Sequence, residues 1–113
     1  MAYRVDLTPQ ANDDLDDILD FLERSYRHFG YSVHETINML DRRDREIRQN
    51  ARSIGRVPHQ GTLRPEFGPG VRNVTKDRAI FYFTVDDEAQ VVRVFSIFYG
   101  GQDHLVTMRK RLP

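Results

Sequence analysis

The chain has 113 residues, a formal net charge of zero at neutral pH and no cysteine. This length favours one domain over residues 1–113, and the lack of cysteine excludes a disulfide framework and a thiolate metal site. The four histidines are not closely paired as zinc ligands are, so we expect neither a metal nor a cofactor.

The chain begins with a predicted strand and a helix. Residues 3–7 alternate between apolar and polar, which predicts a short strand. Thr8 is a good N-cap and Pro9 suits a first helical position, so we expect a helix to begin there and to end near Gly30. Four aspartates near its start, at positions 13, 14, 16 and 17, are expected to interact favourably with the positive end of the helix dipole. Its apolar residues form one stripe: Ala11, Leu15, Ile18, Leu22, Tyr26 and Phe29.

A second helix is predicted from Ser32, whose spacing to Glu35 matches a capping box, to Gly55. The link between the two helices is short, so we expect an antiparallel hairpin. The second helix also has one apolar stripe: Val33, Ile37, Leu40, Ile47, Ala51 and Ile54. Of the residues in the two stripes, we expect Leu15, Ile18 and Ile47 to be buried.

Residues 55–70 contain four glycines and three prolines, which predicts a long loop. Strands are then predicted over residues 71–75, 79–85 and 90–99, where β-branched and aromatic residues are enriched. Leu105, Met108 and Leu112 indicate a short closing helix. The expected fold is therefore α+β, in the order β-α-α-β-β-β, with a helical hairpin packed on a small, mainly antiparallel sheet and a short C-terminal helix. The first strand is free to join either edge of this four-stranded sheet.

Charge is unevenly distributed along the chain. Residues 1–30 carry seven acidic and three basic side chains, whereas residues 41–80 carry five acidic and ten basic ones. Such a chain can present a basic face to an anionic partner, although a solvated helix face explains such a run equally well. Overall neutrality and the acidic first helix argue against a stand-alone nucleic acid-binding domain. The sequence shows neither a membrane span nor a secretory signal, so we expect a cytoplasmic protein without a membrane partner.

Several strings along the chain, taken in their order and spacing, resemble the RelE/ParE superfamily of toxins. They are Tyr3-Arg4-Val5-Asp6-Leu7-Thr8-Pro9-Gln10-Ala11, Asp14-Leu15-Asp16-Asp17-Ile18, Leu63-Arg64-Pro65, Gly70-Val71-Arg72, Arg78-Ala79-Ile80-Phe81-Tyr82, Val91-Val92-Arg93-Val94-Phe95 and Tyr99-Gly100-Gly101-Gln102-Asp103. The resemblance implies the toxin of a type II toxin–antitoxin (plasmid stabilisation) system, neutralised by a cognate antitoxin that alone contacts DNA.

The resemblance is closer to the ParE-like branch, whose members inhibit DNA gyrase and arrest growth. The alternative is a RelE-like ribosome-dependent mRNA endonuclease. ParE-like chains often carry His-Gly-x-Arg-Asp after the last strand, and this chain departs from that pattern. Its Tyr99 and Gln102 stand where the pattern has histidine and arginine.

Three groups of candidate residues follow from the two alternatives. A ribonuclease needs proton transfer and a cation beside the phosphate, for which the candidates are Arg78, Tyr99 and His104. Candidates for target contact are Arg72, Lys76, Arg78, Gln102, Asp103 and Arg109, within the broader surface of residues 72–78 and 98–113. Candidates for an antitoxin groove are Leu22, Tyr26, Ile37 and Leu40. Structural roles compete with these: Arg72 and Arg78 can pair with aspartates of the first helix, Tyr99 can pack at a strand end, and His104 can be solvated.

Overall fold

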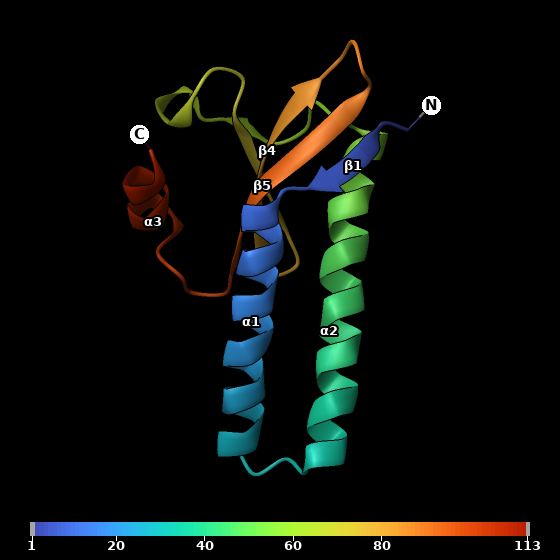
Figure 1. Ribbon diagram of the computed structural model, residues 1–113, viewed down its shortest axis with the longest axis vertical. Helices are drawn as coiled ribbons and strands as arrows, with labels where there is room; N and C mark the ends of the chain where they lie inside the picture. The colour runs from blue at the N-terminus through green and yellow to red at the C-terminus, as the bar shows by residue number, and fades with distance from the viewer. Residues whose placement is uncertain (1, 113) are drawn as a thin grey trace.

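The computed structural model describes residues 2–112 and has the α+β architecture expected from the sequence (Figure 1). A five-stranded sheet has the order β1-β5-β4-β3-β2, with β1 parallel to β5 and the other neighbours antiparallel. The elements are β1 (Arg4–Leu7), α1 (Pro9–His28), α2 (Val33–Ser53), the 3₁₀ turn η1 (Ile54–Arg56), β2 (Thr62–Leu63), the 3₁₀ turn η2 (Pro65–Phe67), β3 (Arg72–Lys76), β4 (Ala79–Asp86), β5 (Val91–Tyr99) and α3 (His104–Arg111). No helix in the described range is long and apolar enough to cross a membrane.

The prediction of four strands was wrong by one. Strand β2 lies inside the segment predicted to be loop, where Thr62 pairs with Asn73 and Leu63 with Arg72. Two residues are too few to show a period of two in the sequence, so only the pairing partner reveals this strand. At the other edge, β1 joins β5, with Arg4 opposite Val91. This resolves which edge the first strand takes.

Both helix starts follow the capping prediction. The Thr8 hydroxyl accepts a hydrogen bond from the Ala11 amide at 3.2 Å. At the second helix, the Ser32 hydroxyl accepts from the Glu35 amide at 3.1 Å, and the Ser32 amide donates to the Glu35 carboxylate at 3.3 Å. Each cap satisfies amides that the first turn of a helix leaves without a partner.

The helical hairpin covers one face of the sheet and extends well beyond it (Figure 1). Leu15, Ile18 and Ile47 are buried against that face, as predicted, together with Phe81 and Val94. The two apolar stripes are longer than the sheet that covers them. Side chains at the far end of the hairpin are therefore exposed: Phe29 (78%), Val33 (55%) and Ile37 (59%).

The second face of the sheet carries a smaller apolar cluster. It consists of Phe67 from η2, Val71, Tyr82, Phe98 and Met108 from α3, all of them buried. The rings of Phe67 and Phe98 meet the ring of Tyr82 edge-on, with centroids 5.7 and 5.8 Å apart. The two central strands are thus covered on both faces, because α3 and η2 cover the face that the hairpin leaves free.

Candidate functional site

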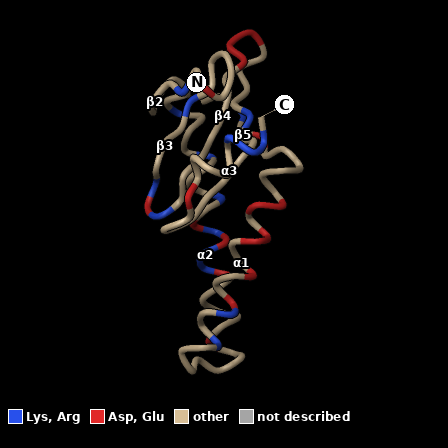
Figure 2. Tube along the Cα trace, turned by 90° about the vertical axis from the view of Figure 1, so that its left-hand side faces the viewer, with Lys and Arg blue, Asp and Glu red and all other residues tan. Residues whose placement is uncertain are grey.

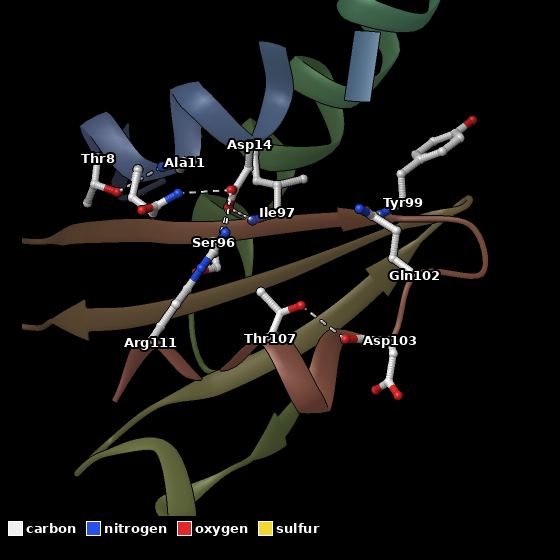
Figure 3. Close-up of polar contacts among 11 residues, drawn as sticks. Thr8, Ala11, Asp14, Ser96, Ile97, Tyr99, Gln102, Asp103, Thr107 and Arg111 are labelled. Carbon is white, nitrogen blue, oxygen red and sulfur yellow. Dashed lines mark hydrogen bonds and ion pairs between the residues drawn. The ribbon is translucent and has the colours of Figure 1, made fainter. Parts of the chain in front are cut away.

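Helix α3 is attached to α1 by an ion pair whose carboxylate is buried. The two terminal nitrogens of Arg111 donate to the two carboxylate oxygens of Asp14, at 2.9 and 2.7 Å (Figure 3). Asp14 is 5% exposed, and it also accepts hydrogen bonds from the Ile97 amide and the Gln10 side chain. Arg111 donates a further hydrogen bond to the Ser96 hydroxyl at 2.8 Å. This network connects the last helix, strand β5 and the first helix.

The sequence prediction grouped Asp14 with the other aspartates near the helix dipole, whereas the structure separates Asp14 from them by burying it. Asp14 lies three residues after Ala11 and four before Ile18, so it belongs to the buried face of α1. This spacing could have predicted from the sequence that Asp14 is buried. Within the described residues, Arg111 is the only arginine bonded to an aspartate of α1; neither Arg72 nor Arg78 takes that role.

A cavity of about 560 Å³ lies beneath α3 on the second face of the sheet. Ser96 and Arg111 form part of its polar wall, and Phe67, Phe95 and Met108 form much of its apolar wall. The cavity adjoins the Asp14–Arg111 pair, in which the cation is already neutralised. Its lining therefore mixes polar and apolar side chains, and the charge of Arg111 is balanced by Asp14.

The turn after β5 uses the side chains that the sequence proposed for target contact. Gln102 accepts a hydrogen bond from the Tyr99 amide at 2.7 Å (Figure 3). Asp103 caps α3 by accepting from the Val106 amide at 3.2 Å. Tyr99 is 9% exposed and belongs to the core under the hairpin. Gln102 and Asp103 therefore hold the turn and start the helix, and both remain exposed, as does Arg109 of α3.

His104 is paired with Tyr82, a residue that was not among the sequence candidates. The Tyr82 hydroxyl lies 2.6 Å from His104 Nδ1, and the His104 ring also lies against Phe98. Tyr82 is fully buried and His104 is half-buried. The pair can share a proton, but the phenol is shielded from any ligand. Tyr82 lies opposite Ser96 beside a shift in the register of β4 and β5, which could not be read from sequence spacing.

The three cations predicted near the sheet do not converge. Arg72 lies at the start of β3, and its guanidinium donates to the His59 carbonyl at 2.9 Å. Lys76 ends the same strand four residues later. At about 3.3 Å per residue, its backbone lies about 13 Å from that of Arg72. Arg78 is exposed in the next turn, where its carbonyl accepts from the Gly100 amide at 2.9 Å. Lys76 and Arg78 thus share one end of the sheet with the turn after β5, and Arg72 lies apart from them.

The antitoxin-groove candidates lie at different depths in the hairpin. Leu22 is buried, Tyr26 and Leu40 are half-buried against the core, and Ile37 is exposed. A hydrogen bond from the neighbouring Arg43 to Tyr26 raises the pKa of the Arg43 guanidinium. Of these candidates, Leu22 therefore belongs to the interior of the hairpin, Tyr26 and Leu40 lie partly at its surface, and Ile37 lies on the surface.

A polar cluster at the opposite end of the sheet escaped sequence reasoning. Asp87 accepts a hydrogen bond from the Tyr3 hydroxyl at 2.9 Å and lies 2.9 Å from His59 Nε2. These hydrogen bonds, first from Tyr3 and then from His59, lower the pKa of the Asp87 carboxyl, and the Tyr3 bond in turn raises the pKa of the Tyr3 phenol. Within residues 2–112, no three histidine, aspartate or glutamate side chains gather as a metal site.

No protein-family model matches the chain, and no curated protein matches it. Solved structures do match. The toxin–antitoxin complex RelBE2 from Mycobacterium tuberculosis is 17% identical, with a TM-score of 0.56 over 88% of this chain and 99% of that chain. The chromosomal ParDE system from P. aeruginosa is 21% identical, with a TM-score of 0.57 over 88% and 97% of the two chains.

The E. coli toxin RelE in the free state, a double arginine-to-alanine mutant, matches over 100% of both chains with a TM-score of 0.56 and 16% identity. At such low identities the likeness establishes the fold. The chain therefore has the RelE/ParE toxin fold that its sequence resemblance implied.

Proposed function

We propose that this chain is the toxin of a type II toxin–antitoxin system and that a cognate antitoxin holds it inactive in the cytoplasm. The observation that carries the proposal is the RelE/ParE fold, matched over 88–100% of this chain and nearly the whole of each neighbour. The RelBE2 structure is described as a toxin–antitoxin complex. An independent sequence resemblance leads to the same group of proteins.

We propose further that the toxin arrests growth by binding DNA gyrase. The charge distribution supports inhibition by binding over RNA cleavage. The sheet face beneath α3 carries a cluster of apolar and aromatic side chains, and Gln102 stands where the resemblance would place an arginine beside a phosphate. Losing one donor that stabilises charge in a transition state commonly reduces the rate ~100- to 1000-fold. Lys76 and Arg78, which share one end of the sheet, are then free to serve as contacts with the target.

Expression of the chain without its antitoxin tests the target. The proposal expects filamentation, DNA-damage signalling and inhibition of supercoiling when the purified chain is added to gyrase. Rapid cleavage of translated mRNA, with supercoiling unaffected, would contradict gyrase inhibition while leaving the toxin assignment in place.

A ribosome-dependent endonuclease is the second candidate, and one observation favours it. The hydrogen bond between Tyr82 and His104 is short, and a tyrosine–histidine pair is capable of general acid–base work. His104→Ala is then expected to abolish mRNA cleavage while the protein remains folded. The burial of Tyr82 counts against this role, because a catalytic group must reach the proton that it transfers.

Co-expression tests the antitoxin. A toxin of this fold is expected to co-purify with the product of its adjacent gene, through the hairpin surface near Ile37 and Leu40. A tagged chain that elutes alone from cells containing that product would contradict the proposal.

A further inference from the structure

A second cavity, of about 350 Å³, opens beside α1 at the point where β5 ends. It is lined by Asp17, Ile18, Phe21, Arg24, Tyr99 and Gln102. Phe21 is 58% exposed although it is a large aromatic residue, and it lies on a helix whose other apolar side chains are buried or half-buried. Exposed aromatic side chains beside a cavity are typical anchors for a partner protein.

The outer surface of α1 beside this cavity is negatively charged. Five exposed carboxylates follow one another along its middle turns: Asp13, Asp16, Asp17, Asp20 and Glu23. Figure 2 shows this acidic surface as repeated red segments on α1. Among residues 2–112, none of these five forms a salt bridge; the paired aspartate of α1 is Asp14. We call these five residues the acidic strip.

Helix stability does not account for the acidic strip. The first turn of α1 contains no acidic residue, and the favourable effect of the dipole falls off within that turn. Most members of the strip are three or four residues apart, a spacing at which like charges destabilise a helix. An approaching cation would relieve this repulsion.

The cavity and the acidic strip are continuous, because Asp17 belongs to both and Phe21 follows it by one helical turn. We propose that this surface binds a basic, amphipathic peptide segment of a partner protein. An apolar side chain of the segment enters the cavity between Phe21 and Tyr99, and its lysines or arginines lie along the acidic strip. Arg24, at the edge of the cavity, donates hydrogen bonds to carbonyl oxygens of the segment.

A second copy of this chain is a poorer occupant. Three of the basic residues on its α2, Arg43, Arg45 and Arg48, are already paired with carboxylates of the same helix. A nucleic acid is disfavoured because phosphates repel the acidic strip. The proposal depends on the cavity and the acidic strip, and the peptide-binding assays that test it are independent of toxicity.

Three fluorescently labelled helical peptides test the proposal by anisotropy. The first carries lysines on one face and leucines on the other; the second has glutamates in place of the lysines, and the third has alanines in place of the leucines. We expect the lysine–leucine peptide to bind, the glutamate peptide not to bind, and the alanine peptide to bind about tenfold more weakly. Equal binding of the first and third peptides would overturn the anchoring role of the cavity.

Matched variants separate this surface from general charge attraction. Phe21→Ala is expected to weaken binding of the lysine–leucine peptide about tenfold, whereas Phe29→Ala, at an even more exposed aromatic position away from the cavity, leaves binding unchanged. Asp17→Asn combined with Asp20→Asn is expected to weaken binding, whereas Glu88→Gln in the exposed β4–β5 turn is not. Circular dichroism confirms that each variant is folded. Equal losses at the test and control positions, or no loss at Phe21, would refute the proposal.

Discussion

Arg111 of α3 reaches the carboxylate of Asp14 in α1 with both terminal nitrogens, the shorter contact measuring 2.7 Å. The two residues are 97 positions apart in the chain, and Asp14 is almost completely buried. Removing one partner of a buried pair leaves the other charge uncompensated, which costs far more than the loss of an exposed pair. This contact is therefore expected to contribute more to the free energy of unfolding than an exposed ion pair does.

Asp14→Ala is expected to lower the free energy of unfolding by about 3 kcal/mol, the lower end of the range for broken buried pairs because Arg111 keeps 28% exposure. Asp16→Ala, two positions along and facing solvent, should change it by less than about 0.5 kcal/mol. Urea denaturation of the two variants measures both values. Equal midpoints would mean that the ion pair contributes nothing.

A second prediction compares the cost of removing a buried side chain of the hairpin with that of removing an exposed one at its far end. Leu15→Ala should cost about 2–5 kcal/mol, because Leu15 is fully buried between α1 and the sheet. Phe29→Ala should cost less than about 0.5 kcal/mol, although both residues belong to the same sequence stripe. Chemical denaturation distinguishes them. A large loss for Phe29→Ala would mean that the far end of the hairpin is covered.

Gly55 is needed where the second helix meets the first strand. Its carbonyl accepts a hydrogen bond from the Tyr3 amide at 2.8 Å, and a Cβ at this position would collide with the Tyr3 carbonyl. Gly55→Ala is therefore expected to destabilise the protein by about 1–3 kcal/mol through displacement of β1. Gly101→Ala is the control, since a Cβ there meets open space. Thermal unfolding of both variants checks the difference, and equal melting temperatures would show that β1 shifts freely.

The cluster of Tyr3, Asp87 and His59 predicts that the stability of the protein depends on pH in the acidic range. Because the pKa of Asp87 is lowered in the folded protein, its contribution is present above the ordinary value of 3.8 and is lost as the pH falls through the lower folded value. Asp87→Asn should therefore melt below the wild type at neutral pH, and the two melting temperatures should converge below about pH 3.8. A gap that stays constant from neutral to acidic pH would contradict this.

Sequence periodicity predicted the helices, their caps and the central strands because each depends on neighbours within a few residues. Ser32 and Glu35 are an example, since the capping box is a local pattern. The features that it missed depend on residues distant in the chain. Strand β2 exists only through pairing with β3, and His104 meets Tyr82 only because α3 folds back over the sheet. Helical periodicity was sufficient to place Asp14 on the buried face of α1. It could not identify Arg111, 97 positions away, as the partner of Asp14.

The last prediction concerns which cations contact the proposed target. Lys76 and Arg78 lie at the end of the sheet that also carries the turn before α3, whereas Arg72 lies at the far end of β3 and is bonded to the His59 carbonyl. If gyrase is bound through this end, Lys76→Ala combined with Arg78→Ala should raise the concentration needed to inhibit supercoiling by about tenfold, because charges at the edge of an interface speed association.

Arg72→Ala removes a positive charge as well, but from the other end of β3, so it should leave inhibition within about twofold of the wild type. Supercoiling assays with purified gyrase measure all three proteins, and growth arrest in cells provides a second readout. Loss of inhibition in Arg72→Ala equal to that in the double variant would show that net charge, rather than this end of the sheet, determines the contact.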